Sequence, residues 1–259
     1  MILMQALLTT EVLSAFLTLT FLEIVLGIDN ILFVSIIAGK LKESLQKKAI
    51  RIGMIMAMVL RLVLLLGISV LIDMQGTWIS VNNSFFQSDI SGQAIILFFG
   101  GIFLLYKSTK EIYEKVEHSG HKIGDEKGST TMTKAIIQIT ILNFVFSIDS
   151  ILTAVGMTNG LPNAIIIMAI SIVVSVLIMM IFAHPVGEFV NKHPSLQVLG
   201  LSFLMLIGFM LLAEAAHLSH TRVLGNEIGA IPKGYLYFAI TFSLLVEFLN
   251  MKTRKPKKV

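Results

Sequence analysis

Residues 12–38 read VLSAFLTLTFLEIVLGIDNILFVSIIA, a long apolar stretch that carries two carboxylates, Glu23 and Asp29, in its interior. A helix needs about 20 mostly apolar residues to cross the hydrocarbon core of a bilayer, and this stretch is longer than that. In lipid the backbone must satisfy its own hydrogen bonds, so we expect the stretch to be helical. An ionised side chain at such a depth costs at least ~2.5 kcal/mol, which favours a functional role for both carboxylates.

Six further stretches are long enough, or nearly so, to cross a bilayer as helices. They cover residues 50–72, 93–112, 134–157, 163–184, 196–215 and 233–250. The composition agrees, because 55% of the residues are hydrophobic and 14% are charged, whereas about a quarter of a soluble domain is charged. The period-2 alternation of an outer-membrane barrel is absent. The sequence therefore predicts an all-α membrane protein with seven transmembrane helices and the lipid bilayer as its solvent.

The basic residues gather in alternate loops. Lys and Arg are frequent after the first and third predicted helices and in the C-terminal tail, whereas the loops after the second, fourth and sixth helices have few or none. Cytoplasmic loops carry the excess of Lys and Arg, so the N-terminus is expected outside and the C-terminus in the cytoplasm. A basic surface interleaved with aromatic residues is missing, so we expect no nucleic acid as a partner.

Two ten-residue segments resemble each other at an offset of 120 residues. Residues 23–32 read EIVLGIDNIL and residues 143–152 read NFVFSIDSIL, so both contain Ile-Asp, a small polar residue, and Ile-Leu. Each copy lies in the first helix of a group of three, and a tandem duplicate of three helices must insert in the opposite orientation. This pattern predicts an inverted 3+3 repeat plus one extra C-terminal helix, as in many secondary transporters.

The repeat and the one long polar segment divide the chain into four predicted parts. These are a first three-helix repeat (1–112), a cytoplasmic linker loop (113–133), a second three-helix repeat (134–215), and the seventh helix with a basic cytoplasmic tail (216–259).

Six oxygen-bearing side chains would meet where the first and fourth helices cross at mid-membrane depth. They are Glu23, Asp29, Asn30, Asn143, Asp149 and Ser150. Oxygen ligands suit Mn²⁺, Mg²⁺ or Ca²⁺ better than Zn²⁺ or Cu⁺, and the chain has no cysteine. We therefore predict a site for a hard divalent cation. The alternative is a structural polar network that holds the two helices together by hydrogen bonds.

The spacing of the carboxylates bears on the shape of the helix. In a regular helix, two side chains six residues apart differ by about 120° in direction and by about 9 Å along the axis. Glu23 and Asp29 therefore share a face only where the helix is unwound. Gly27 precedes Asp29 by two residues, and Ser147 precedes Asp149 in the same way. Small residues at these positions favour a break in the helix or a close helix contact.

Two further charged residues lie in predicted helices. Arg61 is halfway along the second stretch and is expected to pair with a carboxylate, because an unpaired charge there would be expensive. It could be a fixed counter-ion, or it could change partners when metal binds. Glu214 ends the sixth helix and is predicted to lie on the pathway, whereas the nearby His217 and His220 are expected at the surface.

The chain resembles the TerC family of integral membrane proteins. The resemblance rests on residues Glu23–Asn30, Asn143–Ser150, Gly200–His217, Pro232–Tyr235 and Glu247–Asn250. It implies a seven-helix fold related to the LysE-type transporter superfamily. It also implies a role in manganese homeostasis through Mn²⁺ export across the bacterial cytoplasmic (inner) membrane, and in some members a supply of metal to exported enzymes. Family members often carry an acidic residue where this chain has Asn143, so Glu23, Asp29 and Asp149 would form the charged core.

Our hypothesis is a divalent-cation exporter that prefers Mn²⁺, has no prosthetic group, and uses protons as the coupling ion. The first alternative is an exporter of a small organic solute, against which the number of carboxylates argues. The second is a membrane scaffold that passes metal to exported proteins. Beyond the bilayer and the metal ion, the expected partners are a second copy of the chain or the secretion machinery. An intramembrane aspartyl protease would resemble a Gly-x-Gly-Asp pattern, which neither Asp29 nor Asp149 has, so we expect no enzyme.

Overall fold

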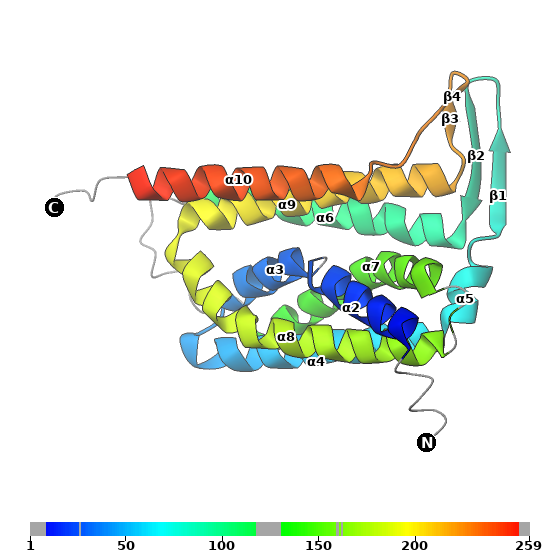
Figure 1. Cartoon of the computed structure of the whole chain (residues 1–259). Helices are drawn as coiled ribbons and strands as arrows, with labels where there is room; N and C mark the ends of the chain where they lie inside the picture. The colour runs from blue at the N-terminus through cyan, green and yellow to red at the C-terminus, as the bar shows by residue number, and fades with distance from the viewer. Residues whose placement is uncertain (1–8, 26, 118–130, 159–160, 162, 254–259) are drawn as a thin grey trace. The chain divides into compact units, whose positions relative to one another are not determined.

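The computed structural model describes residues 9–25, 27–117, 131–158, 161 and 163–253 (Figure 1), and the side chains of Ile28, Asp29 and Asp149 lie outside this description. Within the described residues, seven helical segments are long and apolar enough to cross a membrane. The prediction of a helical membrane protein with seven spanning segments is thus confirmed.

The first spanning segment is divided into two helices, α2 (Thr10–Val25) and α3 (Ile28–Gly39). Gly27 lies between them as the N-cap of α3, and its nitrogen donates to the oxygen of Ile24 in a tight turn at 3.0 Å. The second segment consists of α4 (Glu43–Leu66) and the short α5 (Ile68–Asp73), which Gly67 separates. In the first segment the helix is therefore interrupted just before the position of Asp29.

The other five segments are α6 (Gly92–Glu117), α7 (Met132–Thr158), α8 (Ala164–Lys192), α9 (Pro194–Leu218) and α10 (Lys233–Thr253). Pro194 is in the first turn of α9, where its missing N–H costs no helical hydrogen bond. α6 continues to Glu117, so its last residues, 113–117, overlap the predicted linker. Most of that linker, residues 118–130, lies outside the described residues.

A small antiparallel sheet, which the sequence analysis did not predict, is formed by two loops. Its strands are β1 (Thr77–Asn82), β2 (Phe86–Ser91), β3 (Arg222–Val223) and β4 (Asn226–Glu227), in the order β1-β2-β3-β4. The sheet ties the start of α6 to the end of α9, because the Asp89 nitrogen donates to the Ser219 oxygen at 2.7 Å. Leu224 and Gly225 turn the chain between β3 and β4, both with positive φ.

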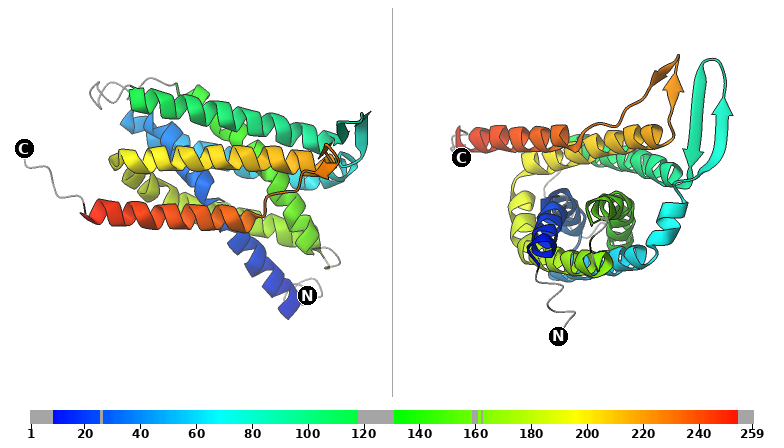
Figure 2. Two further views of the ribbon diagram at one scale, coloured as in Figure 1. Left: turned by 90° about the horizontal axis from the view of Figure 1, so that it is seen from above. Right: turned by 45° about the vertical axis from the view of Figure 1, so that its right-hand side comes forward.

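The helices form two compact units. The first unit contains α2, α3, α4, α5, α7 and α8. In it, α2 and α3 pack along α8, while α4 packs against both α7 and α8. Figures 1 and 2 show α2, α3 and α7 on the same side of the α4 and α8 pair.

The second unit contains α6, α9, α10 and the sheet. α6 and α9 pack closely along their length, and α10 has smaller contacts with α9. Leu236 is the one buried residue of α10, so most of this helix presents its side chains outward. Both predicted three-helix repeats contribute helices to both units, and the inverted repeat itself stays a prediction.

Candidate ion site in the first helical unit

A buried ion pair joins α2 to α4 in the first unit. The guanidinium Nη1 of Arg61 donates to Oε2 of Glu23, and the side chains of Arg61 and Glu23 are 3% and 5% exposed. Arg61 also donates from Nε to the Ser147 hydroxyl of α7 at 3.2 Å. One arginine therefore connects three spanning helices through a carboxylate and a hydroxyl.

The regular spacing of buried residues places these groups on inward faces. On α2 the buried residues include Leu19, Thr20 and Glu23, which recur at the three- and four-residue spacing of one helix face. On α4 Ala57, Arg61 and Leu65 follow one another at four-residue intervals and are all buried. The charged groups thus occupy positions that apolar residues hold one turn away.

The energetics of this pair depend on its isolation from water. Moving two charges out of water is expensive, and the cost is recovered only when both are paired and hydrogen-bonded. Removing one partner would leave the other charge buried without compensation, which costs about 3–5 kcal/mol. Each of these two charged side chains therefore needs the other in order to be buried without a large cost.

Short side chains on α7 extend the polar region. The amide nitrogen of Asn143 donates to the Ile139 oxygen at 2.9 Å, and Ser147 donates to the Asn143 oxygen. Ser150 donates to the Ser147 oxygen at 3.2 Å. Such bonds to the preceding helical turn satisfy hydroxyls inside a membrane. The Ser147 hydroxyl has a second role, because its oxygen accepts the bond from Arg61.

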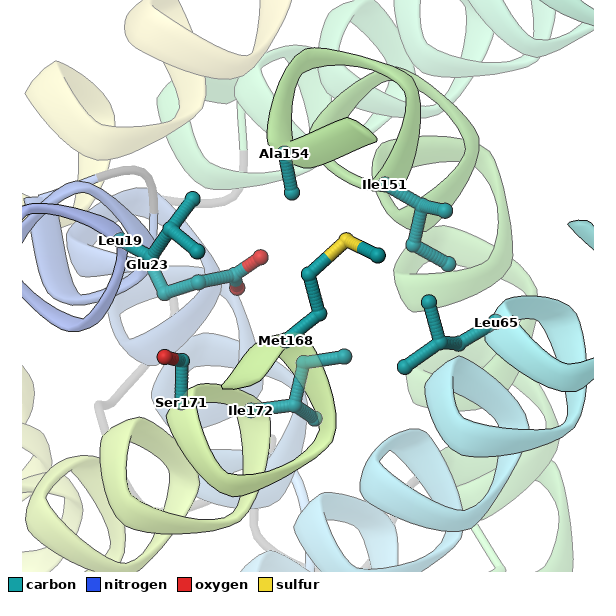
Figure 3. Close-up of a pocket in the computed structure, with 8 residues that line it drawn as sticks. All are labelled: Leu19, Glu23, Leu65, Ile151, Ala154, Met168, Ser171 and Ile172. Carbon is teal, nitrogen blue, oxygen red and sulfur yellow. The ribbon is translucent and has the colours of Figure 1, made fainter. Parts of the chain in front are cut away.

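Two small cavities lie in the first unit. The first, which we call the Glu23 cavity, is lined by Leu19, Glu23, Leu65, Ile151, Ala154, Met168, Ser171 and Ile172. Figure 3 shows the Glu23 carboxylate pointing into this cavity toward Met168. The second, which we call the Arg61 cavity, is lined by Asn30, Ile31, Val34, Met54, Ala57, Arg61, Asn143, Val176 and Met179.

The structure brings several of the predicted site residues into this region. Glu23, Asn30, Asn143 and Ser150 are all buried in the first unit. Asn30 and Asn143 line the Arg61 cavity together. Two of the predicted oxygen-bearing residues are therefore found at the same cavity.

Three predicted residues are placed less completely. The backbones of Asp29 and Asp149 lie in the first turn of α3 and in the interior of α7, and their side chains are outside the described part of the chain. Among the described side chains, no group of three or more His, Cys, Asp or Glu could hold a metal ion. Glu214 lies in α9 of the second unit. The full ligand set and the role of Glu214 stay predictions.

Sequence reasoning missed three polar residues of this region. Ser147 bonds to Arg61, although it was noted only as the counterpart of Gly27. The Ser171 hydroxyl lies at the wall of the Glu23 cavity. The Thr20 hydroxyl is buried one turn before Glu23 and has no hydrogen-bond partner among the described residues. In the sequence, each of them is only a hydroxyl residue close to a charged or small residue in an apolar helix. This pattern alone is too weak to indicate a site.

Comparison with known proteins supports the resemblance drawn from the sequence. The family described as "Integral membrane protein TerC family" matches residues 8–258. A "UPF0053 protein" of Haemophilus influenzae is 39% identical over 93% of this chain and 94% of its own length. The "UPF0053 inner membrane protein YgdQ" of Escherichia coli is 40% identical over 92% of each chain.

A third relative is longer. The "UPF0053 inner membrane protein YoaE" of Escherichia coli is 40% identical over 97% of this chain, which corresponds to 45% of YoaE. No solved structure matches the chain. The two Escherichia coli relatives are named inner membrane proteins, which agrees with the seven spanning segments and fits a multi-pass protein of that membrane.

Proposed function

The chain belongs to the TerC family of integral membrane proteins, and from this premise we propose that it exports a divalent metal cation, preferably Mn²⁺, across the inner membrane. The observation that carries the proposal is the Glu23 carboxylate, buried within the first spanning segment and paired with an arginine. Ionisable groups at membrane depth are expensive and mark ion or proton pathways.

The available ligand atoms favour a hard cation. Asn30 and Asn143 line the Arg61 cavity, and Glu23 lines the Glu23 cavity. We propose that Asp29, Asp149 and the Ser150 hydroxyl complete the set. Carboxylate, amide and hydroxyl oxygens suit Mn²⁺, Mg²⁺ and Ca²⁺, whereas Zn²⁺ and Cu⁺ favour sites with sulfur or imidazole. Here the metal is the transported substrate.

The packing of helices supports two related halves. Under the proposed repeat, the first span corresponds to α7, and α4 corresponds to α8. The contact of α2 and α3 with α8 is then equivalent to the contact of α4 with α7, and both are extensive. The α6–α9 contact joins the two corresponding third helices. These equivalent contacts support two related halves, and we propose that the halves form an inverted 3+3 repeat in which one half rocks against the other to give alternating access.

We place the N-terminus outside and the C-terminus in the cytoplasm, because the basic residues follow the positive-inside rule. Carboxylates that have left water are readily neutralised by protons. We propose that metal release to the outside is accompanied by proton uptake at Asp29 and Asp149, which would make the protein a cation–proton antiporter.

The proposal is tested by cellular manganese. A bacterial strain without its own manganese exporters is loaded with Mn²⁺, and its manganese content is measured by elemental analysis. The wild-type chain should lower the content several-fold, whereas Asp29→Asn and Asp149→Asn should not. Asp73→Asn, at the exposed end of α5, is the matched control and should act like the wild type. A membrane-inserted wild-type chain that leaves the manganese content unchanged would rule the proposal out.

A further inference from the structure

The Glu23–Arg61 pair lies between the two cavities of the first unit. On α4, Met54 and Ala57 line the Arg61 cavity, whereas Leu65 lines the Glu23 cavity, and Arg61 comes between them along the helix. Because a helix rises about 1.5 Å per residue, this order is also an order in depth. The two cavities are thus found at different depths, on opposite sides of the arginine.

The same order recurs on α7. Asn143 lines the Arg61 cavity, Ile151 and Ala154 line the Glu23 cavity, and Ser147 comes between them. Ser147 is the residue whose hydroxyl accepts the hydrogen bond from Arg61 at 3.2 Å. The ion pair and its serine partner therefore occupy the layer that separates the cavities on two different helices.

α8 and the first span show the same order. On α8, Met168 and Ser171 line the Glu23 cavity, whereas Val176 and Met179 line the Arg61 cavity. In the first span, Glu23 lines the Glu23 cavity and Asn30 lines the Arg61 cavity, and Gly27 lies between them in the sequence. A Cβ atom added to Gly27 would lie 2.1 Å from the Met179 sulfur. The first span and α8 are thus in close contact at Gly27.

We propose that Arg61 is a built-in cation that closes the pathway between the two cavities and competes with the transported ion for Glu23. This inference rests on the proposed function. The guanidinium already neutralises the carboxylate that a metal ion would need, and it lies at the boundary between the two cavities. A metal ion passes from one cavity to the other when Arg61 releases Glu23 and keeps its bond to Ser147.

The competition has a measurable consequence. When only a fraction of the protein is in the binding-competent state, the apparent affinity for the ligand is reduced by that fraction. Removing the positive charge makes Glu23 permanently available, so Arg61→Gln should bind Mn²⁺ at least ~10-fold more tightly. Transport should slow in the same variant, because no cation remains to displace the metal. Arg61→Lys keeps the charge and should keep the weaker, wild-type affinity.

Mn²⁺ affinity is measured on purified, folded protein from the loss of the electron paramagnetic resonance signal of free Mn²⁺. Arg51→Gln is the control, because Arg51 is an exposed arginine of the same helix and its loss should leave the affinity unchanged. Equal affinities in wild type and folded Arg61→Gln would show that Arg61 is a fixed counter-ion and would overturn the inference. Wild-type protein that neither binds nor moves Mn²⁺ would instead overturn the proposed function.

A second test does not require Arg61 variants to fold. The chain has no cysteine, so single cysteines report access without further engineering. Ser171→Cys reports on the Glu23 cavity and Ala57→Cys on the Arg61 cavity. With a membrane-impermeant thiol reagent, each cysteine should react from one side of sealed vesicles only, and the two sides should differ. Reaction of both cysteines from the same side would overturn the inference, whatever the transport assay shows.

Discussion

Glu23 and Arg61 contribute to the stability of the protein as a pair, because each compensates the buried charge of the other. Glu23→Gln leaves the Arg61 charge buried without a counter-charge, so we expect the free energy of unfolding to fall by about 3–5 kcal/mol. The double variant Glu23→Gln/Arg61→Gln removes both charges and should recover most of that loss. Unfolding in detergent, followed by circular dichroism for both single variants and the double variant, measures the coupling. Additive losses in the double variant would show that the two side chains do not interact.

Gly27 leaves room for the end of the Met179 side chain and for the carbonyl oxygen of Glu23. Its replacement by alanine would put a Cβ atom 2.1 Å from the Met179 sulfur and 2.9 Å from the Glu23 carbonyl oxygen. We expect Gly27→Ala to lower the free energy of unfolding by about 1–3 kcal/mol, the usual cost of overpacking.

Gly156 provides the matched control for Gly27, because it lies on α7 with no atom within 4 Å of an added Cβ. Gly156→Ala should be neutral or slightly stabilising, since alanine favours a helix by about 0.8–1 kcal/mol over glycine. Thermal unfolding of the two variants in the same detergent makes the comparison. Similar behaviour of both variants would contradict the close contact at Gly27.

At the scale of single residues, the sequence predicted the costly groups and missed the inexpensive ones. Glu23 and Arg61 stand out because a charge in an apolar stretch needs a reason. Ser147 and Thr20 do not stand out, because a hydroxyl can satisfy itself on the preceding helical turn. Their positions in the site follow from the packing of α2, α4 and α7, which the sequence of one chain does not contain.

Among the elements, the contact of α6 with α9 depends on two glycines that face each other. An added Cβ at Gly101 would lie 2.8 Å from the Gly208 oxygen, and one at Gly208 would lie 3.1 Å from the Gly101 oxygen. Small residues allow helices to approach closely in a membrane, where packing replaces the hydrophobic effect. Gly208→Val should therefore force the helices apart and lower the midpoint of thermal unfolding by several degrees.

Gly234→Ala is the control for this prediction, because nothing lies within 4 Å of an added Cβ at that position of α10. It should leave the midpoint of thermal unfolding nearly unchanged. A midpoint for Gly208→Val that equals the wild-type value would show that the two helices do not need the glycine contact.

The positions of the spanning helices followed from hydropathy, although α4 begins earlier than predicted, at Glu43, and α8 ends later, at Lys192. The small strands were not predicted. Among the described residues, each predicted spanning stretch overlaps a helical segment, because lipid leaves the backbone no alternative. β1 and β2 lie in the loop 74–91, where water can satisfy the backbone and no single structure is imposed. The pairing of β2 with β3 joins residues far apart in the chain, and a periodic pattern cannot reveal such a contact.

For the whole molecule, the distribution of Lys and Arg predicts the orientation. A fluorescent protein fused after Val259 should fold and fluoresce, because we expect the C-terminal tail in the cytoplasm. Alkaline phosphatase inserted after Ser84, in the turn between β1 and β2, should be active, because we expect that turn outside. The reversed pair of fusions, with the two reporters exchanged, is the control and should be inactive. Activity of the reversed pair would show that the chain inserts the other way.

At this scale the number of spans and the family followed from the sequence, and the grouping of helices into units did not. Hydropathy predicts the number of spans, and short motifs indicate the family. The packing of α6 with α9, and of α4 with α7, depends on side-chain shapes along whole helices. The sequence repeat of residues 23–32 and 143–152 indicates two related halves, yet it leaves open which helices of the halves would pack together.

The central claim is that the chain moves Mn²⁺ by means of buried carboxylates. The most direct test is Mn²⁺ flux driven by a metal gradient in liposomes that contain the purified protein. The account predicts flux for the wild type, and its loss in folded Glu23→Gln/Arg61→Gln, Asp29→Asn and Asp149→Asn. Absence of flux in the wild type, or wild-type flux in all these variants, would contradict it.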